Sequence, residues 1–172
     1  MEVCFIGHKT IEKNEELVSL IKETVITLIK KGATNFLFGS MSEFDNLCWE
    51  TVTELKNEYS FIKRIYVRSA YQHIDKSYKN HLLKFYEGTY FPPRIKNAGK
   101  YSYVERNREM IDKASCCVFY YNENYIPALK QTLKNKALPS RRNSGTKIAY
   151  EYALKNKKEI INLYKEKTNE KR

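Results

Sequence analysis

The architecture of this chain follows from two adjoining segments, Arg106-Asn107-Arg108-Glu109-Met110-Ile111-Asp112 and Cys116-Cys117-Val118-Phe119-Tyr120-Tyr121. The first has a helical pattern in which Val104, Met110 and Ile111 are the apolar positions. The second is short, continuously apolar and rich in β-forming residues, which predicts a buried strand. A turn of small residues, Asn143-Ser144-Gly145-Thr146, follows further along the chain and predicts the start of another helix.

Strand-like and helix-like segments alternate along the rest of the chain. Strands are predicted at residues 2–6, 35–38, 61–67, 116–121 and 159–164. The clearest helix lies between the first two strands, where one apolar stripe contains Leu17, Leu20, Ile21, Val25, Leu28 and Ile29. This alternation predicts an α/β, Rossmann-like fold with a mainly parallel sheet and helices on both faces.

The length of 172 residues, 42% of them hydrophobic and 30% charged, predicts one globular domain. We assign this domain to residues 1–164 and a charged tail to residues 165–172. Two segments interrupt the alternation: an aromatic-rich insert at 68–100 and a basic loop at 122–143, which we expect to be flexible. The insert should hold one or two short helices over the carboxyl edge of the sheet. Its aromatic side chains should fill core or a subunit interface, and the alternative is that one stacks on a base.

The net charge of +11 predicts attraction to polyanions such as nucleic acid, acidic membranes or nucleotides. The alternative is a solvated, lysine-rich surface, since many positive charges fall in the expected loop and tail. No apolar run reaches the roughly 20 residues that a membrane span requires, and no targeting segment is evident. We therefore expect a cytoplasmic protein with no membrane partner.

The four cysteines and three histidines lack metal-ligand spacing. Cys4, Cys48, Cys116 and Cys117 fall in predicted strands and a helix, which indicates reduced, buried thiols. Cys116 and Cys117 should point to opposite faces of their strand. The sequence predicts neither a metal site nor a cofactor.

Several loops should meet at one edge of the sheet, because the carboxyl ends of parallel strands lie together there. Arginine forks and the N–H groups at a helix N-terminus both bind anions. We therefore predict that this edge binds a phosphate-bearing, nucleotide-like molecule, with Arg106 and Arg108 on the phosphate and Asp45 on a ribose hydroxyl. The full set of predicted ligand-binding residues is Gly7, His8, Gly39, Ser40, Asp45, Arg106, Asn107, Arg108, Ser144, Gly145 and Thr146.

Most of these residues also have a purely structural interpretation. Asp45 could belong to a capping box with Ser42, and Ser144 could simply cap a helix. Arg106 and Arg108 could be surface charges that pair with acidic neighbours on the same helix. Neither the dinucleotide-binding fingerprint nor the Walker pattern is present, which disfavours dinucleotide-binding and Walker-type ATP-binding functions.

Taken together, Phe5-Ile6-Gly7-His8, the turn from Gly39 to Asp45, residues 106–112 and Ser144-Gly145-Thr146 resemble the SLOG superfamily, in particular its DUF1273/YpsA-like branch. The resemblance covers nearly the whole chain in the right order. It implies a Rossmann-like fold that binds nucleotide-derived ligands, in a superfamily that includes the LOG phosphoribohydrolases and the DNA-binding DprA proteins. It also implies that Arg106 contacts the ligand, and that the chain forms a homo-oligomer as LOG proteins do.

The chain departs from the LOG pattern at the position of a catalytic carboxylate. LOG proteins carry a glutamate two to three residues after the Gly-Thr pair, where this chain has Ile148 and Ala149, and Glu151 is turned away on the helix. Cleavage of an N-glycosidic bond needs a carboxylate that stabilises an oxocarbenium-like ribose or activates water. Ser40 also replaces one glycine of the YpsA-like turn. The question of enzymatic activity stays open, and no catalytic residue is assigned.

Three functions follow from these observations. The preferred one is a sensor or sequestering protein for a nucleotide-derived signal, such as an ADP-ribose-like molecule or a cyclic nucleotide. The second is a nucleoside-monophosphate N-glycosidase that uses Glu109, Asp45 or Glu151 as its acid. The third is a protein that binds single-stranded nucleic acid, motivated by the charge of +11 and the resemblance to DprA.

Overall fold

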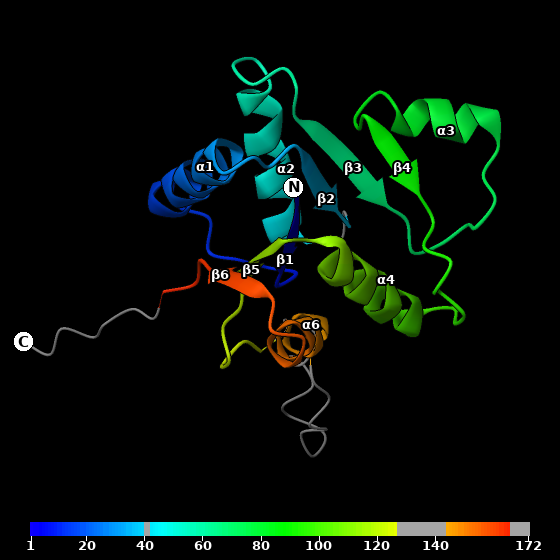
Figure 1. The fold of residues 1–172 in the computed structure, drawn as a ribbon. Coiled ribbons are helices and arrows are strands. Elements are labelled where there is room, and N and C mark those ends of the chain that lie inside the picture. Colours follow the sequence, from blue (N-terminus) through cyan, green and yellow to red (C-terminus); the bar gives the residue numbers. More distant parts are fainter. Residues whose placement is uncertain (40–41, 127–143, 166–172) are drawn as a thin grey trace, which may run out of the picture.

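The computed structural model describes residues 1–39, 42–126 and 144–165, which form a six-stranded sheet flanked by helices (Figure 1). Ser40, most of the basic loop and most of the charged tail lie outside the described residues. The strands are β1 (Glu2–Gly7), β2 (Asn35–Phe38), β3 (Lys63–Val67), β4 (Gly88–Tyr90), β5 (Cys116–Tyr120) and β6 (Glu159–Asn162). The helices are α1 (Glu15–Lys30), α2 (Glu43–Leu55), α3 (Lys76–Leu82), α4 (Lys100–Lys113) and α6 (Gly145–Lys155).

The strand order in the sheet is β4-β3-β2-β1-β5-β6, and every neighbouring pair is parallel. The predicted fold class is therefore confirmed. The chain adds strands on one side of β1 as far as β4 and then crosses to the other side, where β5 and β6 lie. A topological switch point results at the carboxyl ends of β1 and β5, which is where ligands bind in open α/β sheets.

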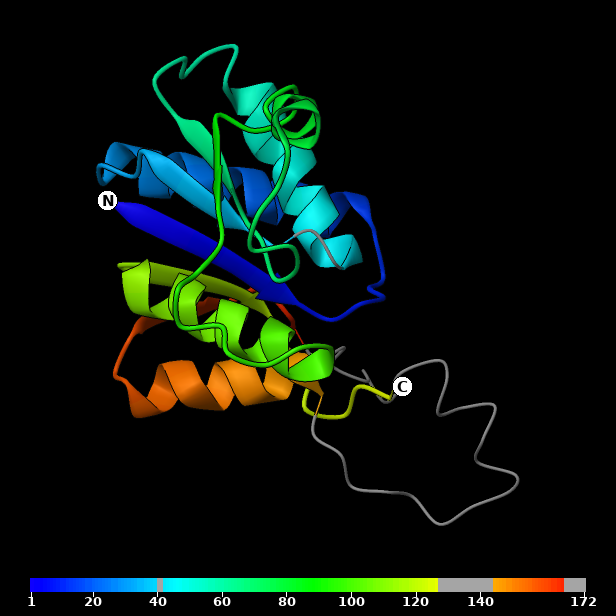
Figure 2. The same ribbon diagram turned by 90° about the vertical axis from the view of Figure 1, so that its right-hand side faces the viewer.

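Helices cover both faces of the sheet, as Figure 2 shows in a view along one side of the molecule. On one face, α1 and α2 bury their apolar stripes, which include Val25 and Val52, against Phe5 and other strand side chains. On the other face, α4 and α6 pack Met110, Ile111 and small alanine side chains against the sheet. Adjacent strand residues alternate between the faces, so Cys116 lies in the first core and Cys117 in the second. All four cysteines are free and buried, as predicted.

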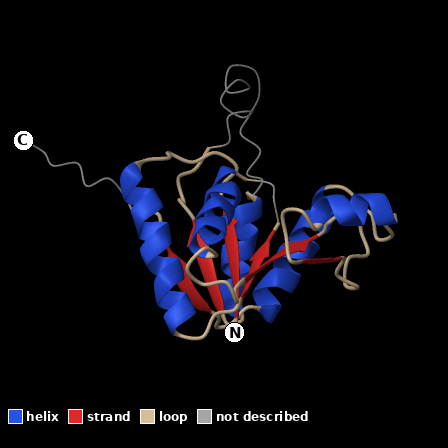
Figure 3. Cartoon of the chain, turned by 90° about the horizontal axis from the view of Figure 1, so that it is seen from above, coloured by secondary structure: helices blue, strands red, loops and turns tan. Residues whose placement is uncertain are grey.

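The aromatic-rich insert is only partly as expected, because it contains a strand. It forms α3 and then β4, a three-residue edge strand paired with β3, and this unit lies at one end of the molecule (Figures 1 and 3). Gly88-Thr89-Tyr90 is too short and too polar to show a strand pattern. Tyr86 packs against Trp49 and Tyr66, whereas Tyr71 is 73% exposed.

An ion pair fixes this edge strand to its neighbour. Arg64 of β3 binds the Glu87 carboxylate through Nη2 (2.7 Å) and Nε (3.2 Å), and the backbone N–H of Arg64 donates to the same carboxylate (2.7 Å). Lys56 lies 3.4 Å from the carboxylate. Burial alone would raise the pKa of Glu87, but the hydrogen bonds from Arg64 and the two positive charges lower it to about 2.

We predict that Glu87→Gln destabilises the fold at pH 7 by roughly 1–3 kcal/mol, because it leaves the buried guanidinium of Arg64 without its counter-charge. The pKa of Glu87 is lower in the folded state, so its stabilisation is present above pH 4.5 and is lost as the pH falls toward 2. Urea unfolding at pH 7 and pH 3 measures both effects, and the variant should show a weaker pH dependence than the parent.

Glu54→Gln is the matched control, because Glu54 forms an exposed ion pair with Lys22. It should leave the unfolding free energy unchanged within error. Equal effects of the two substitutions would contradict a structural role for the Arg64–Glu87 pair.

Candidate functional site

A cavity of about 460 Å³ lies at the carboxyl ends of the central strands, and we call it the switch-point cavity. Its walls come from segments far apart in the sequence: the end of β1, the start of α2, one side of α4 and the start of α6. Most of the predicted ligand-binding residues line it, namely Gly7, His8, Gly39, Asp45, Arg106, Asn107, Ser144, Gly145 and Thr146. The predicted convergence of these loops on one crevice is therefore present.

Arg106 is the charged group around which this cavity is built. Its side chain comes from α4 and is only 4% exposed. Nη1 donates to the backbone carbonyl of Gly39 (2.6 Å) and Nε donates to Oδ1 of Asn107 (3.0 Å), whereas Nη2 donates to no residue that the structure describes. Burial lowers the pKa of Arg106, and the Asp45 carboxylate is the main opposing influence. The guanidinium of Arg106 is therefore a buried cation, and some of its N–H groups donate to none of the described residues.

Gly39 is required by the position of this guanidinium. A Cβ atom added at Gly39 would overlap the guanidinium of Arg106, so a side chain here would displace the arginine. The Gly39 N–H donates to Oδ1 of Asp45 (3.2 Å), and the Asp45 N–H donates to Oγ of Ser42 (3.0 Å). The predicted Ser42 cap thus exists, and Asp45 also orients the turn beneath Arg106. The glycine after β2 is explained by the close approach of Arg106.

The first turn of α6 supplies backbone donors to the same cavity. Ser144 caps the helix, because its Oγ accepts the N–H of Lys147 (3.1 Å) and its carbonyl accepts the N–H of Ile148 (3.1 Å). The N–H groups of Gly145 and Thr146 have no partner within the helix, as is general for a first turn. The positive end of the helix dipole therefore lies at the cavity wall. A helix start and a buried arginine in one cavity favour an anionic group.

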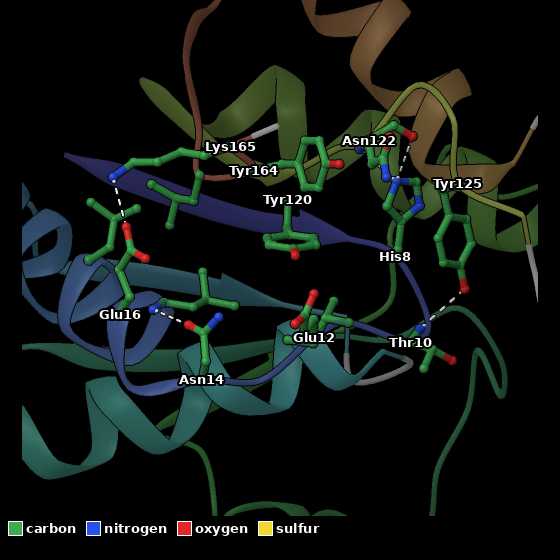
Figure 4. Close-up of a pocket in the computed structure, with 14 residues that line it drawn as sticks. His8, Thr10, Glu12, Asn14, Glu16, Tyr120, Asn122, Tyr125, Tyr164 and Lys165 are labelled. Carbon is green, nitrogen blue, oxygen red and sulfur yellow. Dashed lines mark hydrogen bonds and ion pairs between the residues drawn. The ribbon is translucent and has the colours of Figure 1, made fainter. Parts of the chain in front are cut away.

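His8 is a buried member of the site and not a surface loop residue. It is 1% exposed, and its ring stacks on Tyr125 with ring centres 3.9 Å apart. Nε2 lies 2.9 Å from the backbone N and 3.1 Å from the carbonyl oxygen of Asn122 (Figure 4), and Nδ1 is buried with no hydrogen-bond partner among the described residues. Burial lowers the pKa of His8 to about 4, although a hydrogen bond to the Asn122 backbone opposes the shift. The ring is therefore neutral near pH 7.

Arg108 does not belong to this site, so the prediction that both arginines face one phosphate is wrong. Residues two apart on a helix point about 200° away from each other, and Arg106 already faces the cavity. Arg108 lies over the ring of Tyr152, 5.1 Å from its centre, on the side where α4 meets α6. Ser40, which was also predicted to bind the ligand, lies outside the described residues.

Eight residues that line the cavity were not among the predicted ligand-binding residues: Phe5, Ile6, Lys9, Ser42, Lys100, Tyr103, Met110 and Tyr125. Tyr103 was the most accessible to prediction, because it precedes Arg106 by three residues and therefore shares its helix face. Its ring lies 5.8 Å from the Arg106 guanidinium. No sequence pattern indicates that Tyr125 lines the cavity, because its position depends on tertiary contacts with the loop after β1.

The acidic residues considered for catalysis are mostly elsewhere. Glu151 is exposed and lies 3.9 Å from Lys147, and Glu109 lies 3.3 Å from Lys113. Asp112 forms hydrogen bonds with Arg94 and Tyr152 between α4 and its neighbours. Among the described residues that line the cavity, Asp45 is the one carboxylate.

The described residues contain neither a metal-binding cluster nor a membrane-spanning helix. Within 1–39, 42–126 and 144–165, no group of three His, Cys, Asp or Glu side chains could hold a metal ion. None of the helices in that part of the chain combines the length and apolar character needed to cross a bilayer.

Comparison with known proteins supports the fold. No family model and no curated protein matches the chain. The structure is similar to that of DNA processing protein A from Helicobacter pylori, a protein described for its single-stranded DNA binding mode. The TM-score is 0.55 and the sequence identity is 16%, over 93% of this chain and 63% of that one. This chain therefore spans less than two thirds of the length of its neighbour.

The similarity confirms the Rossmann-like α/β fold. A similarity at 16% identity shows the fold and does not identify the ligand. The DUF1273/YpsA-like branch gains no support from it.

The neutral state of His8 gives a testable pH dependence. The pKa of His8 is about 4 in the folded state, whereas an unperturbed histidine has a pKa of about 6.5. Stability is therefore unaffected by His8 above pH 6.5, and falls by up to about 3 kcal/mol as the pH drops toward 4, because the unfolded chain takes up the proton first. Urea unfolding between pH 7 and pH 4.5 should show this loss, and His8→Gln should show less of it.

NMR titration of the His8 ring checks the same point in the parent protein, without depending on whether the variant folds. The ring protons should keep their neutral shifts down to about pH 5. Titration with a midpoint near 6.5 would show that the ring is not held neutral by burial.

Proposed function

We propose that this protein binds a nucleotide-derived small molecule, with the phosphate of the ligand in the switch-point cavity. The observation that carries the proposal is the buried Arg106 guanidinium beside the first turn of α6. A buried guanidinium is costly without a counter-charge, and Asp45 supplies only one negative charge to a cavity that Lys9 and Lys100 also line. A phosphate would supply the missing negative charge.

The geometry suggests how such a ligand would be held. The N–H groups of Gly145 and Thr146 would donate to phosphate oxygens, and Arg106 would neutralise the phosphate charge. Asp45 would accept a hydrogen bond from a ribose hydroxyl. A cavity of about 460 Å³ lies within the range of small-molecule sites.

The carboxylate groups that line the cavity favour binding over catalysis. Hydrolysis of a glycosidic bond normally uses two carboxyl groups on opposite sides of the bond. Asp45 is the one carboxylate among the described lining residues, and it already accepts the Gly39 N–H. We therefore propose a sensor or sequestering protein, of the DUF1273/YpsA-like type, that acts as a homo-oligomer.

Whether the backbone N–H of Gly145 donates to the phosphate can be tested by substitution. We predict that Gly145→Pro lowers the affinity for ribose 5-phosphate and AMP about tenfold, because proline at the first helical position removes one N–H while keeping the helix. Isothermal titration calorimetry measures the affinity, and circular dichroism checks that α6 is retained.

Gly145→Ala is the matched control, because it keeps the N–H and its Cβ would enter open space. It should bind as the parent does. The proposal fails if neither compound binds the parent protein, or if the proline and alanine variants bind equally well.

Binding of single-stranded nucleic acid is the second candidate function. It is favoured by the fold similarity to a protein described as a single-stranded DNA binder and by the net charge of +11. Single-strand binders combine a basic groove with aromatic side chains that stack on successive bases, whereas the switch-point cavity, at about 460 Å³, has the size of a site for one small molecule.

Fluorescence anisotropy with oligo(dT) of increasing length separates the two candidates. We expect weak binding that does not tighten with length at physiological salt, because the anion site accommodates one phosphate. A single-strand binder would instead lose affinity steeply as salt rises, with a slope of roughly −0.7 for each phosphate neutralised. Tight, length-dependent binding of that kind would make the second candidate the better one.

A further inference from the structure

The starts of two neighbouring helices line the switch-point cavity, and no acidic side chain neutralises either of them. α4 and α6 pack side by side on one face of the sheet (Figure 2). The cavity is lined by Lys100, the first residue of α4, and by Gly145 and Thr146, the first residues of α6. The first turns of α1 and α2 contain acidic residues, whereas those of α4 and α6 contain none. Two positive helix ends therefore act on the same cavity.

Of the helices in the described part of the chain, α4 is the one that begins without a capping side chain. Its N-cap residue is Gly99, with a φ of 66°, and no side chain accepts an N–H of the first turn. In α1, α2, α3 and α6 the N-cap side chain accepts such an N–H. The first backbone N–H groups of α4 are therefore left for water or for a ligand.

Two exposed lysines at this cavity have no counter-charge among the described residues. Lys9 follows β1 and Lys100 begins α4, and both line the cavity. Neither forms an ion pair with a described carboxylate, whereas Lys22 and Lys113 each pair with a glutamate. The charges of Lys9 and Lys100 are therefore available to a ligand.

The described lining of the cavity has a net positive charge. Arg106, Lys9 and Lys100 supply three positive charges, and Asp45 supplies one negative charge. His8 is neutral near pH 7. The lining therefore has a net charge of +2, to which the two helix ends add. A cleft lined by one sign of charge attracts most strongly the ligand with the larger opposite charge.

We infer that Lys9 and Lys100 make this cavity selective for a phosphate with two negative charges, which means a terminal phosphate monoester. This inference rests on the proposed function, and it narrows the class of ligand for the same site. A terminal phosphate carries about −1.5 to −2 charges at pH 7, whereas the phosphate of a diester carries one. Cyclic nucleotides and the internal phosphates of a nucleic-acid strand are diesters, so both match the lining less well.

The buried and the exposed cations have different parts in this selectivity. Arg106 is almost fully buried and fixed by the Gly39 carbonyl, so its guanidinium orients the phosphate. The lysines are exposed, and an ammonium on a flexible stem acts on a phosphate as a point charge. Loss of a lysine should therefore change the preference for charge more than it changes the binding of a singly charged phosphate.

Calorimetry at low ionic strength with a matched pair of probes tests this selectivity. Adenosine 5′-phosphorofluoridate differs from AMP by a fluorine in place of one phosphate oxygen, which leaves it a single negative charge. The parent should bind AMP about tenfold more tightly than the phosphorofluoridate, because the second charge interacts with a net charge of +2. Lys9→Gln and Lys100→Gln should each reduce this ratio to about threefold, and the double variant should reduce it to about one. 3′,5′-Cyclic AMP, which is a diester, should also bind the parent more weakly than AMP.

Lys96→Gln is the matched control, because Lys96 is an exposed lysine of the loop before α4 that does not line the cavity. It removes the same charge and should leave the ratio unchanged. The charge selectivity is wrong, and the phosphate site stands, if AMP binds and responds to Gly145→Pro but the ratio is one in the parent, survives the double substitution or falls equally in Lys96→Gln. Binding of cyclic AMP as tight as that of AMP has the same meaning. If AMP and ribose 5-phosphate both fail to bind the parent, both proposals fail together.

Discussion

The buried hydrogen bond from the Arg106 guanidinium to the Gly39 carbonyl is the interaction on which the site depends. It joins α4 on one face of the sheet to the end of β2, across the switch point. A buried cation must be compensated, and Asn107 and Asp45 contribute to this from two other directions. The bond also restricts the sequence, since a side chain at Gly39 would occupy the space of the guanidinium. One charge thus fixes the cavity wall, the turn after β2 and the identity of that turn residue.

Much of this arrangement could be predicted, because strand and helix periods and the rule for parallel sheets act locally. The order of elements placed Gly39, Arg106 and Gly145 at one edge before any contact was known. Arg108 was misplaced because two arginines close in sequence were treated as close in space, although a helix separates them by more than half a turn. Edge strand β4 was missed because three residues carry too little pattern. Two predicted segments, the basic loop beyond residue 126 and the tail from 166, fall outside the described residues.

One wall of the site could not be predicted from the sequence, for a different reason. The contact of His8 with Asn122 joins residues separated by 114 positions. The motif that contains His8 places it at the edge of the sheet, but Asn122 and Tyr125 belong to no motif that could indicate their contacts with it. This wall is visible only once the loop after β1 and the segment after β5 are seen together.

The fold similarity and the chemistry of the site address separate questions. A Rossmann-like sheet places loops at a switch point whatever the ligand, so likeness to DNA processing protein A constrains where binding occurs and not what is bound. What is bound depends on the local charges. A strand of nucleic acid presents a phosphate at every step and is best matched by a continuous basic track. Here a buried guanidinium and the start of α6 meet in one cavity of about 460 Å³. That arrangement suits a small molecule with one anionic group.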